Sequence, residues 1–162
     1  MNELNFKAER ISKTATITLK SNIKDVFLLF DAFEEKKWEP EWDLTLIYPE
    51  REVIEEGTTF KTQGHGHGEG EFLWIVSKFQ PENYLIQYLV STLNRYWTIT
   101  VKCNQLDYNK TKAEVIYSFT GLNEKGNEIN MQSLDRMYAH NLKDWEEAIN
   151  YYLKYGKALT HK

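Results

Sequence analysis

The segment Ile129–Gly156 reads INMQSLDRMYAHNLKDWEEAINYYLKYG, and it decides the fold of this chain. Apolar residues recur along it at every third or fourth position, which is the period of one face of an α-helix. This apolar face comprises Met131, Leu134, Tyr138, Leu142, Trp145, Ile149, Tyr152 and Gly156. The pattern predicts one long amphipathic helix, and its wide aromatic face needs a concave surface from the rest of the chain to cover it.

The residues before this segment predict a sheet of seven strands. The first strand lies within Ile11–Leu19, where apolar and polar residues mostly alternate. The six further strands are expected at Leu44–Tyr48, Thr58–Gln63, Phe72–Phe79, Tyr84–Val90, Arg95–Leu106 and Lys112–Phe119. Their connections are short, which favours antiparallel hairpins over the long crossovers of a parallel sheet.

Two short helices, at about 23–30 and 32–38, are expected between the first and second strands, with a cap at Ser21 or Asn22 and a stop at Pro40.

Strand alternation also predicts inward-facing positions, namely Trp97, Ile99, Val101, Cys103, Ala113, Val115, Tyr117 and Phe119. The expected fold class is therefore α+β, with a curled seven-stranded antiparallel sheet that packs its concave face around the long C-terminal helix. Residues 1–162 are expected to form a single domain.

Composition and charge exclude several classes of protein. The chain has 162 residues, a formal net charge of −4 and scattered basic residues, so no basic face is expected for nucleic acid. No apolar run reaches the ~18–20 residues that span a bilayer, and no leader segment is evident, which predicts a cytoplasmic protein. The lone Cys103 excludes an internal disulfide and is expected to be a small buried apolar residue.

The order of elements resembles the START-like, or SRPBCC, superfamily, whose members have the helix-grip (Bet v 1-like) fold. The residues that carry the resemblance are Val26–Phe30, Trp38–Trp42 (WEPEW), Gly57–Phe60 (GTTF) and the terminal helix. Within it, Asn141–Ile149 is similar to the closing helix of the polyketide cyclase/dehydrase-like and Hsp90-activator-homologue-like groups. The resemblance implies an internal cavity for a hydrophobic or amphipathic small molecule, but members range from carriers to cyclases and chaperone-associated domains.

The segment Gly64–Glu71 reads GHGHGEGE and holds residue types that ligate metals. If it is extended, His65, His67, Glu69 and Glu71 project to one side. Alternating glycines would hold such ligands poorly, so no metal site and no cofactor are predicted. Two interpretations stay open, a mobile lip near a cavity mouth and an ordinary exposed turn.

A set of apolar and aromatic residues is expected to line the cavity. Its members are Trp74, Tyr88, Trp97, Tyr117, Met131, Leu134, Tyr138 and Trp145. Aromatic walls with a few tyrosine hydroxyls are typical of small-molecule pockets. The same pattern also fits a solid core, because aromatic stripes at strand and helix spacing are what folding itself requires.

Catalytic candidates are few. Asp135 lies at the edge of the helical apolar face, where it either complements the helix dipole or faces the cavity as a general acid or base. Tyr138, His65 and His67 are the other candidates. The charged runs Glu34–Lys37 and Glu146–Glu147 are expected to be solvated helix faces.

Three functions are compatible with these features. The first is binding, sequestration or transport of a hydrophobic or lipid-like small molecule without turnover. The second is a small cyclase or dehydratase-type enzyme that uses cavity residues. The third is a chaperone-associated interaction module. Homodimer formation and a chaperone partner are left open by the sequence.

Overall fold

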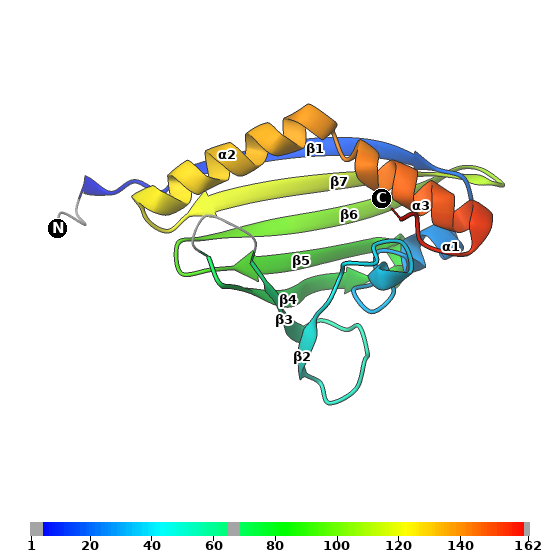
Figure 1. Ribbon diagram of the computed structural model, residues 1–162, viewed down its shortest axis with the longest axis horizontal. Coiled ribbons are helices and arrows are strands. Elements are labelled where there is room, and N and C mark those ends of the chain that lie inside the picture. Colours follow the sequence, from blue (N-terminus) through cyan, green and yellow to red (C-terminus); the bar gives the residue numbers. More distant parts are fainter. Residues whose placement is uncertain (1–4, 65–68, 161–162) are drawn as a thin grey trace.

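The protein is described here from a computed structural model, which defines residues 5–64 and 69–160, with the backbone alone for residues 137–139. The strands are β1 (Arg10–Leu19), β2 (Thr45–Tyr48), β3 (Thr59–Gln63), β4 (Glu71–Gln80), β5 (Leu85–Ser91), β6 (Arg95–Asp107) and β7 (Lys110–Gly121). They form one seven-stranded sheet in the order β1-β7-β6-β5-β4-β3-β2, and every neighbouring pair is antiparallel (Figure 1). The predicted α+β class and the seven strands are therefore confirmed.

The inner face of the sheet carries the residues that the alternation predicts. On β6, Trp97, Ile99, Val101 and Cys103 are all buried, with Cys103 only 1 % exposed. On β7, Ala113, Val115 and Phe119 are buried and Tyr117 is half-buried. Paired residues such as Val101 and Val115 sit side by side in the β6–β7 register, so both strands present one continuous apolar surface.

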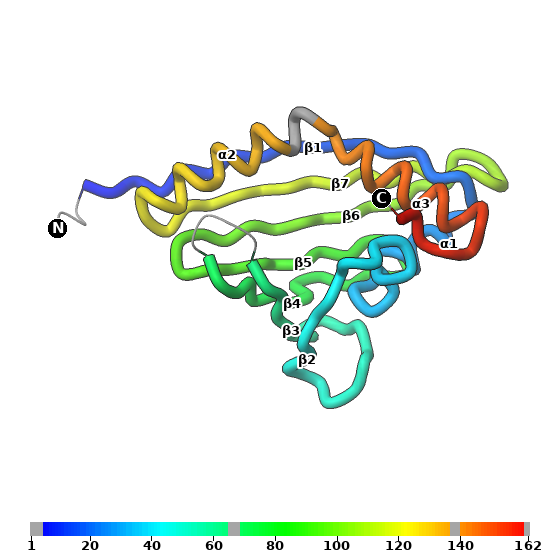
Figure 2. The backbone as a smooth tube through the Cα atoms, viewed as in Figure 1, coloured from blue at the N-terminus to red at the C-terminus, as the bar shows by residue number. Residues whose placement is uncertain are grey.

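The C-terminal helix differs from the prediction, because it is two helices. α2 spans Glu124–His140 and α3 spans Lys143–Tyr155, and the backbone between them turns at Asn141 and Leu142 (Figure 2). Both of these residues have positive φ, 52° and 57°. The apolar period continues through the break and neither residue is a glycine or proline, which is why the sequence predicted a single helix. The predicted end at Gly156 is confirmed, since Gly156 caps α3 with a φ of 71°.

The chain between β1 and β2 contacts β6 and β7 through its first helix. It contains α1 (Ile23–Leu28), whose first turn is capped by Asn22, and the 3-10 helix η2 (Glu35–Lys37). The predicted second helix is thus only one 3-10 turn. Two indole N–H groups fasten this segment, because Trp38 donates to the Leu29 carbonyl at 2.7 Å and Trp42 donates to the Ala32 carbonyl at 2.8 Å. A second 3-10 turn, η3 (Pro81–Asn83), joins β4 to β5.

The helices α2 and α3 lie end to end along the β1–β7 side of the sheet (Figure 1). Their side chains reach the free edge of β1. The Thr18 N–H donates to Glu146 at 2.8 Å, the Lys20 N–H donates to Asn150 at 2.8 Å, and Asn150 donates back to the Thr18 carbonyl at 3.0 Å. The prediction that Glu146 is a solvated residue is therefore wrong, because its carboxylate binds the sheet edge. Among the described residues, no helix is long and apolar enough to cross a membrane.

Candidate functional site

The interior is a continuous set of aromatic rings. One group joins Trp42, Phe60, Trp74 and Tyr88, with ring centroids 5.4 to 6.3 Å apart. A second group runs from Phe72 through Trp97, Phe119 and Tyr117 to Trp145, and Trp145 in turn contacts Phe30 and Trp38. Such walls supply large apolar area together with a few polar atoms at fixed positions.

A pocket of about 210 Å³ opens under the break between α2 and α3. Its walls come from β7 (Tyr117 and Phe119), from α2 (Ser133, Arg136 and His140) and from the start of α3 (Leu142 and Asp144). We call this pocket the chamber. The ring of Tyr117 leads inward, because it lies 6.4 Å from the ring of Trp145, which is 5.7 Å from the ring of Trp38.

The hydroxyl of Tyr117, which lines the chamber, makes no hydrogen bond to any described residue. The same is true of the Trp145 indole N–H and the Glu35 carboxyl, which lie outside the lining of the chamber. Side chains that are fully enclosed normally satisfy such groups, and in the described part of the chain the amide nitrogen of Asn130 is the one enclosed side-chain atom without a partner. The Tyr117 hydroxyl therefore borders space that a water molecule or a ligand atom can enter.

Burial perturbs the carboxyl group of Glu35. Burial, together with the nearby charge of Glu39, raises the pKa of its carboxyl to about 8. Burial also raises the pKa of Asp31 to about 6, against the lowering effect of its hydrogen bond from the Phe33 N–H at 2.7 Å. Carboxyl groups of this kind are neutral or partly neutral near pH 7, and perturbed groups cluster at functional sites.

The pKa values of the two interior tyrosines, Tyr88 and Tyr117, are also raised. Burial raises the pKa of Tyr117, and the charges of Glu35 and Asp144 raise it further. Burial likewise raises the pKa of Tyr88, with added effects from Asp31 and Glu35. The Tyr88 hydroxyl is held by a hydrogen bond to the Phe30 carbonyl at 2.7 Å, whereas that of Tyr117 has no hydrogen-bond partner among the described residues.

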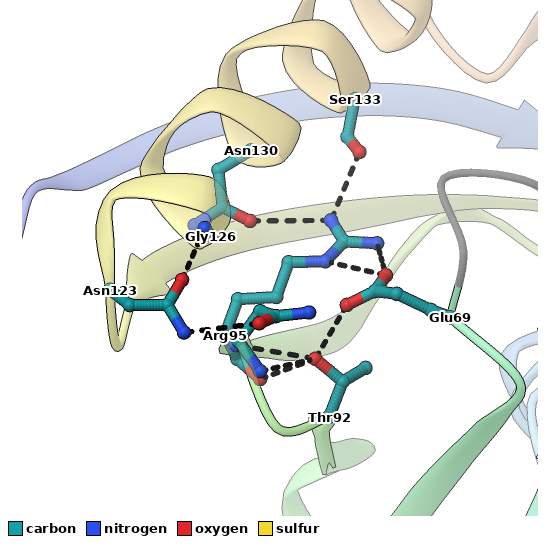
Figure 3. Close-up of polar contacts among 8 residues, drawn as sticks. Glu69, Thr92, Arg95, Asn123, Gly126, Asn130 and Ser133 are labelled. Atoms are coloured by element: carbon teal, nitrogen blue, oxygen red, sulfur yellow. Dashed lines mark hydrogen bonds and ion pairs between the residues drawn. The ribbon is translucent and has the colours of Figure 1, made fainter.

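A buried polar network connects α2 with the β5–β6 turn and with the residue before β4 (Figure 3). The Arg95 guanidinium donates to Glu69 at 2.8 and 3.1 Å and to Asn130 and Ser133 of α2 at 3.2 and 3.0 Å. Thr92 donates a further hydrogen bond to Glu69 at 2.6 Å. Burial alone would raise the pKa of Glu69, but the bonds from Arg95 and Thr92 and the charge of Arg95 bring it below its usual value.

This network joins three elements. Glu69 precedes β4, Arg95 begins β6, and Asn130 and Ser133 belong to α2. The first turn of α2 lies directly on the β5–β6 turn, where a Cβ atom at Gly126 would collide with the Asn94 carbonyl oxygen. A larger pocket of about 540 Å³ lies between β4 and the β5–β6 turn, and Glu69 and Thr92 of the network line it. Phe72 is the one aromatic residue in that lining, whereas Tyr117 and Phe119 both line the chamber, so the chamber is the stronger candidate for an apolar ligand.

The predicted lining residues divide into three groups. Trp74, Tyr88, Trp97, Tyr117, Leu134 and Trp145 are buried or half-buried. Met131 is 51 % exposed, because α2 turns this part of the predicted apolar face toward the N-terminal segment. The side chain of Tyr138 lies outside the described residues, as do His65 and His67.

Other predictions concern charged residues. Asp135 is exposed on α2. In the described ranges 5–64 and 69–160, no group of three or more potential metal ligands comes together.

The prediction that Glu35 belongs to a solvated helix face is wrong, since Glu35 is half-buried and burial raises the pKa of its carboxyl. The sequence also gave no sign of the Arg95–Glu69 pair, because alternation says which residues face inward but not which charges meet.

Comparisons with known proteins bear on the fold. No protein-family model and no curated protein sequence matches this chain. Among solved structures, truncated norcoclaurine synthase from Thalictrum flavum is similar with a TM-score of 0.68 at 13 % identity, covering 98 % of this chain and 99 % of that one. Ara h 8.0201 is similar with a TM-score of 0.62 at 16 % identity, over 91 % of this chain and 99 % of that one.

A third similar structure comes from a bacterium. The Zhui aromatase/cyclase from Streptomyces sp. R1128 is similar with a TM-score of 0.62 at 10 % identity, over 94 % of this chain and all of that one. Nearly the whole chain is matched in each case, with the curled sheet and the C-terminal helices included. The chain therefore has the helix-grip (Bet v 1-like) fold.

Proposed function

We propose that this protein binds a hydrophobic or amphipathic small molecule in the chamber. The observation that carries the proposal is the pocket of about 210 Å³ beside the rings of Tyr117 and Phe119, where the Tyr117 hydroxyl has no hydrogen-bond partner among the described residues. Leaving such groups unpaired costs free energy unless water or a ligand satisfies them. Apolar walls with a few oriented polar groups are the usual composition of a small-molecule site.

The proposal is tested first by native mass spectrometry of the gently purified protein. A retained ligand would appear as a mass above that of the denatured chain. A panel of lipids and aromatic compounds would then be screened by melting temperature, because a ligand that binds only the folded state raises it by mass action. Absence of binding in both experiments would contradict the proposal.

The location is tested by closing the chamber mouth. His140 is exposed and lines the mouth, so H140W should place an indole across it and weaken binding by about tenfold or more, equivalent to ~1.4 kcal/mol. E147W is the matched control, since Glu147 is exposed on α3 and lies outside the lining of the mouth. Equal affinities in both variants would place the ligand elsewhere.

A second candidate function, acid–base chemistry on the bound ligand, is favoured by the raised pKa of Glu35. A carboxyl with a pKa of about 8 donates a proton near neutral pH and can accept it again. Two of the similar structures are named as a synthase and an aromatase/cyclase. With a turned-over substrate, E35Q should abolish turnover while binding persists. A chaperone partner and a homodimer stay predictions.

A further inference from the structure

We propose that the ligand of the chamber carries a carboxylate. Ser133, Arg136 and His140 of α2 bind this group, while the apolar part of the ligand packs against Tyr117 and Phe119. This inference rests on the proposed function, because it requires the chamber to be the binding site. It adds the chemical class of the ligand and the residues that select it.

The first support is the hydrogen-bonding capacity of the α2 side of the chamber. Ser133, Arg136 and His140 line it, and their spacing of three and four residues places them on one side of the helix. A guanidinium has five N–H donors and no acceptor, so Arg136 offers only donors to a ligand. Its planar fork also matches a carboxylate, which it can bind through two parallel hydrogen bonds.

The hydroxyls of the lining add to these donors. The Ser133 oxygen accepts a hydrogen bond from Arg95 at 3.0 Å, and buried Glu69 holds that guanidinium in place (Figure 3). Arg95 has no acceptor, so the Ser133 hydroxyl cannot donate to it, and no described residue accepts the Ser133 hydrogen. The Tyr117 hydroxyl also has no partner among the described residues. Both hydroxyls can therefore donate to an oxygen atom of a ligand.

The second support is a further cation beside the chamber. Lys13 of β1 pairs directly with Tyr117 of β7. It projects from the same inner face of the sheet as Ala15 and Ile17, because alternate residues of a strand share one face. Directly paired residues on one face lie within reach of each other, so the charge of Lys13 acts on the side of the chamber that Tyr117 forms.

One carboxylate, Asp144, also lines the chamber. It belongs to the first turn of α3, and Leu142 before that turn provides no side-chain cap. The N–H groups of this turn carry a partial positive charge, which offsets part of the charge of Asp144. The other charged side chains nearby lie outside the lining: Asp135 and Glu147 are exposed, and Lys143 pairs with Glu146 at 3.3 Å.

The volume and the aromatic wall limit the rest of the ligand. The chamber holds about 210 Å³, which is below the ~300–1,000 Å³ typical of sites for drug-sized ligands. The rings of Tyr117 and Phe119 are 5.8 Å apart at an angle of 25°, and they form the apolar wall. A compact aromatic carboxylate such as benzoate matches both features.

The test compares benzoate with benzamide, which has nearly the same shape and no charge, by isothermal titration calorimetry of the full chain at pH 7. At low salt we expect benzoate to bind about fivefold or more tightly than benzamide. This ratio should approach one in ~1 M salt, where charges are screened over about 3 Å. The chain has a net charge of −4, so its overall charge cannot produce a preference for the anion.

Two variants of the lining should change the benzoate affinity in opposite directions. R136Q removes a cation and should lower the affinity about fivefold, whereas D144N removes a carboxylate and should raise it about twofold. Benzamide should bind both variants about as tightly as the wild type. K125Q is the matched control, because Lys125 is an exposed cation of α2 outside the lining, and it should keep the preference for benzoate.

The outcomes separate this inference from the proposed function. If benzamide binds the wild type as tightly as benzoate, or if R136Q keeps the preference, the inference is overturned and the binding function stands. The same holds if a compound of the lipid and aromatic panel binds and benzoate does not. If neither these two compounds nor the panel bind, both proposals fail.

Discussion

Glu35 brings a carboxyl group into an aromatic interior, where its ionisation is unfavourable. Its pKa is about 8 in the folded protein, against a usual value of 4.5. Between these two pH values the folded chain holds a proton that the unfolded chain has lost. Stability must therefore fall as pH rises from about 4.5 to about 8, because the proton is bound more tightly by the folded state.

The direction of this pH dependence gives a prediction for the stability of the variant E35Q. The amide cannot ionise, so the variant should unfold at a higher temperature than the wild type at pH 9 and at about the same temperature at pH 4. The expected gain at pH 9 is at least ~1 kcal/mol, or roughly 2–4 °C in melting temperature. Scanning calorimetry across this pH range measures it, with E147Q as the control that should show no pH-dependent gain.

The break between α2 and α3 is the main element that departs from the sequence pattern. Asn141 and Leu142 both adopt the left-handed conformation, which is common for asparagine and energetically unfavourable for leucine. Leu142 is nevertheless buried, and its side chain forms part of the chamber wall. The strain at this break is thus balanced by packing at the site that we propose to be functional.

Glycine substitution distinguishes a break from a continuous helix. N141G should leave stability unchanged or raise it slightly, because glycine adopts positive φ without cost. If residue 141 lay within one long helix, the same change would cost about 0.5–1 kcal/mol. E147G in the middle of α3 provides the comparison and should show that cost in urea unfolding. Equal destabilisation of the two variants would argue against the break.

The Arg95–Glu69 pair couples the β3–β4 hairpin to α2. Both side chains are at most 5 % exposed, so R95M would leave a buried carboxylate without its partner and should cost ~3–5 kcal/mol. Since the pKa of Glu69 is lowered in the folded state, the stability from this pair is present above the usual carboxyl pKa and is lost as pH falls through the folded value.

Two comparisons make that prediction specific. The double variant R95M/E69L should recover part of the loss, because no charge is left buried. K61M breaks the exposed Lys61–Glu71 pair at 3.2 Å and should cost less than ~1 kcal/mol. Urea unfolding of the wild type, R95M, E69L and R95M/E69L gives the coupling free energy. A coupling near zero for Arg95 and Glu69 would show that the pair does not hold the elements together.

For the molecule as a whole, the sequence predicted the sheet well and the site only in part. The inward positions of β6 and β7 could be identified because a strand has a period of two that tertiary structure preserves. The chamber could not, because it lies under a break at Asn141 and Leu142 that no glycine or proline marks. Glu35 sits in a run of charged residues that is typical of a solvated helix, and no period in the sequence indicates its burial.

Cys103 offers a measure of global unfolding. It is 1 % exposed on the inner face of β6, and burial raises the pKa of its thiol to about 12. We expect no reaction with a thiol reagent at pH 8 in the folded state, and labelling in urea at the rate of complete unfolding. Labelling that is independent of urea would instead indicate local opening of β6. A protein with C103A gives the baseline for the reagent.

The contacts of α2 and α3 with the first strand have a consequence for self-association. The outer backbone groups of Thr18 and Lys20 are occupied by Glu146 and Asn150, and those of Lys7 and Glu9 by Asn127. Those groups are the ones that an incoming strand from a second molecule would use to extend the sheet. The helices α2 and α3 thus also block the pairing of this edge with a strand of a second molecule. A condition that detaches them would expose the edge and promote aggregation.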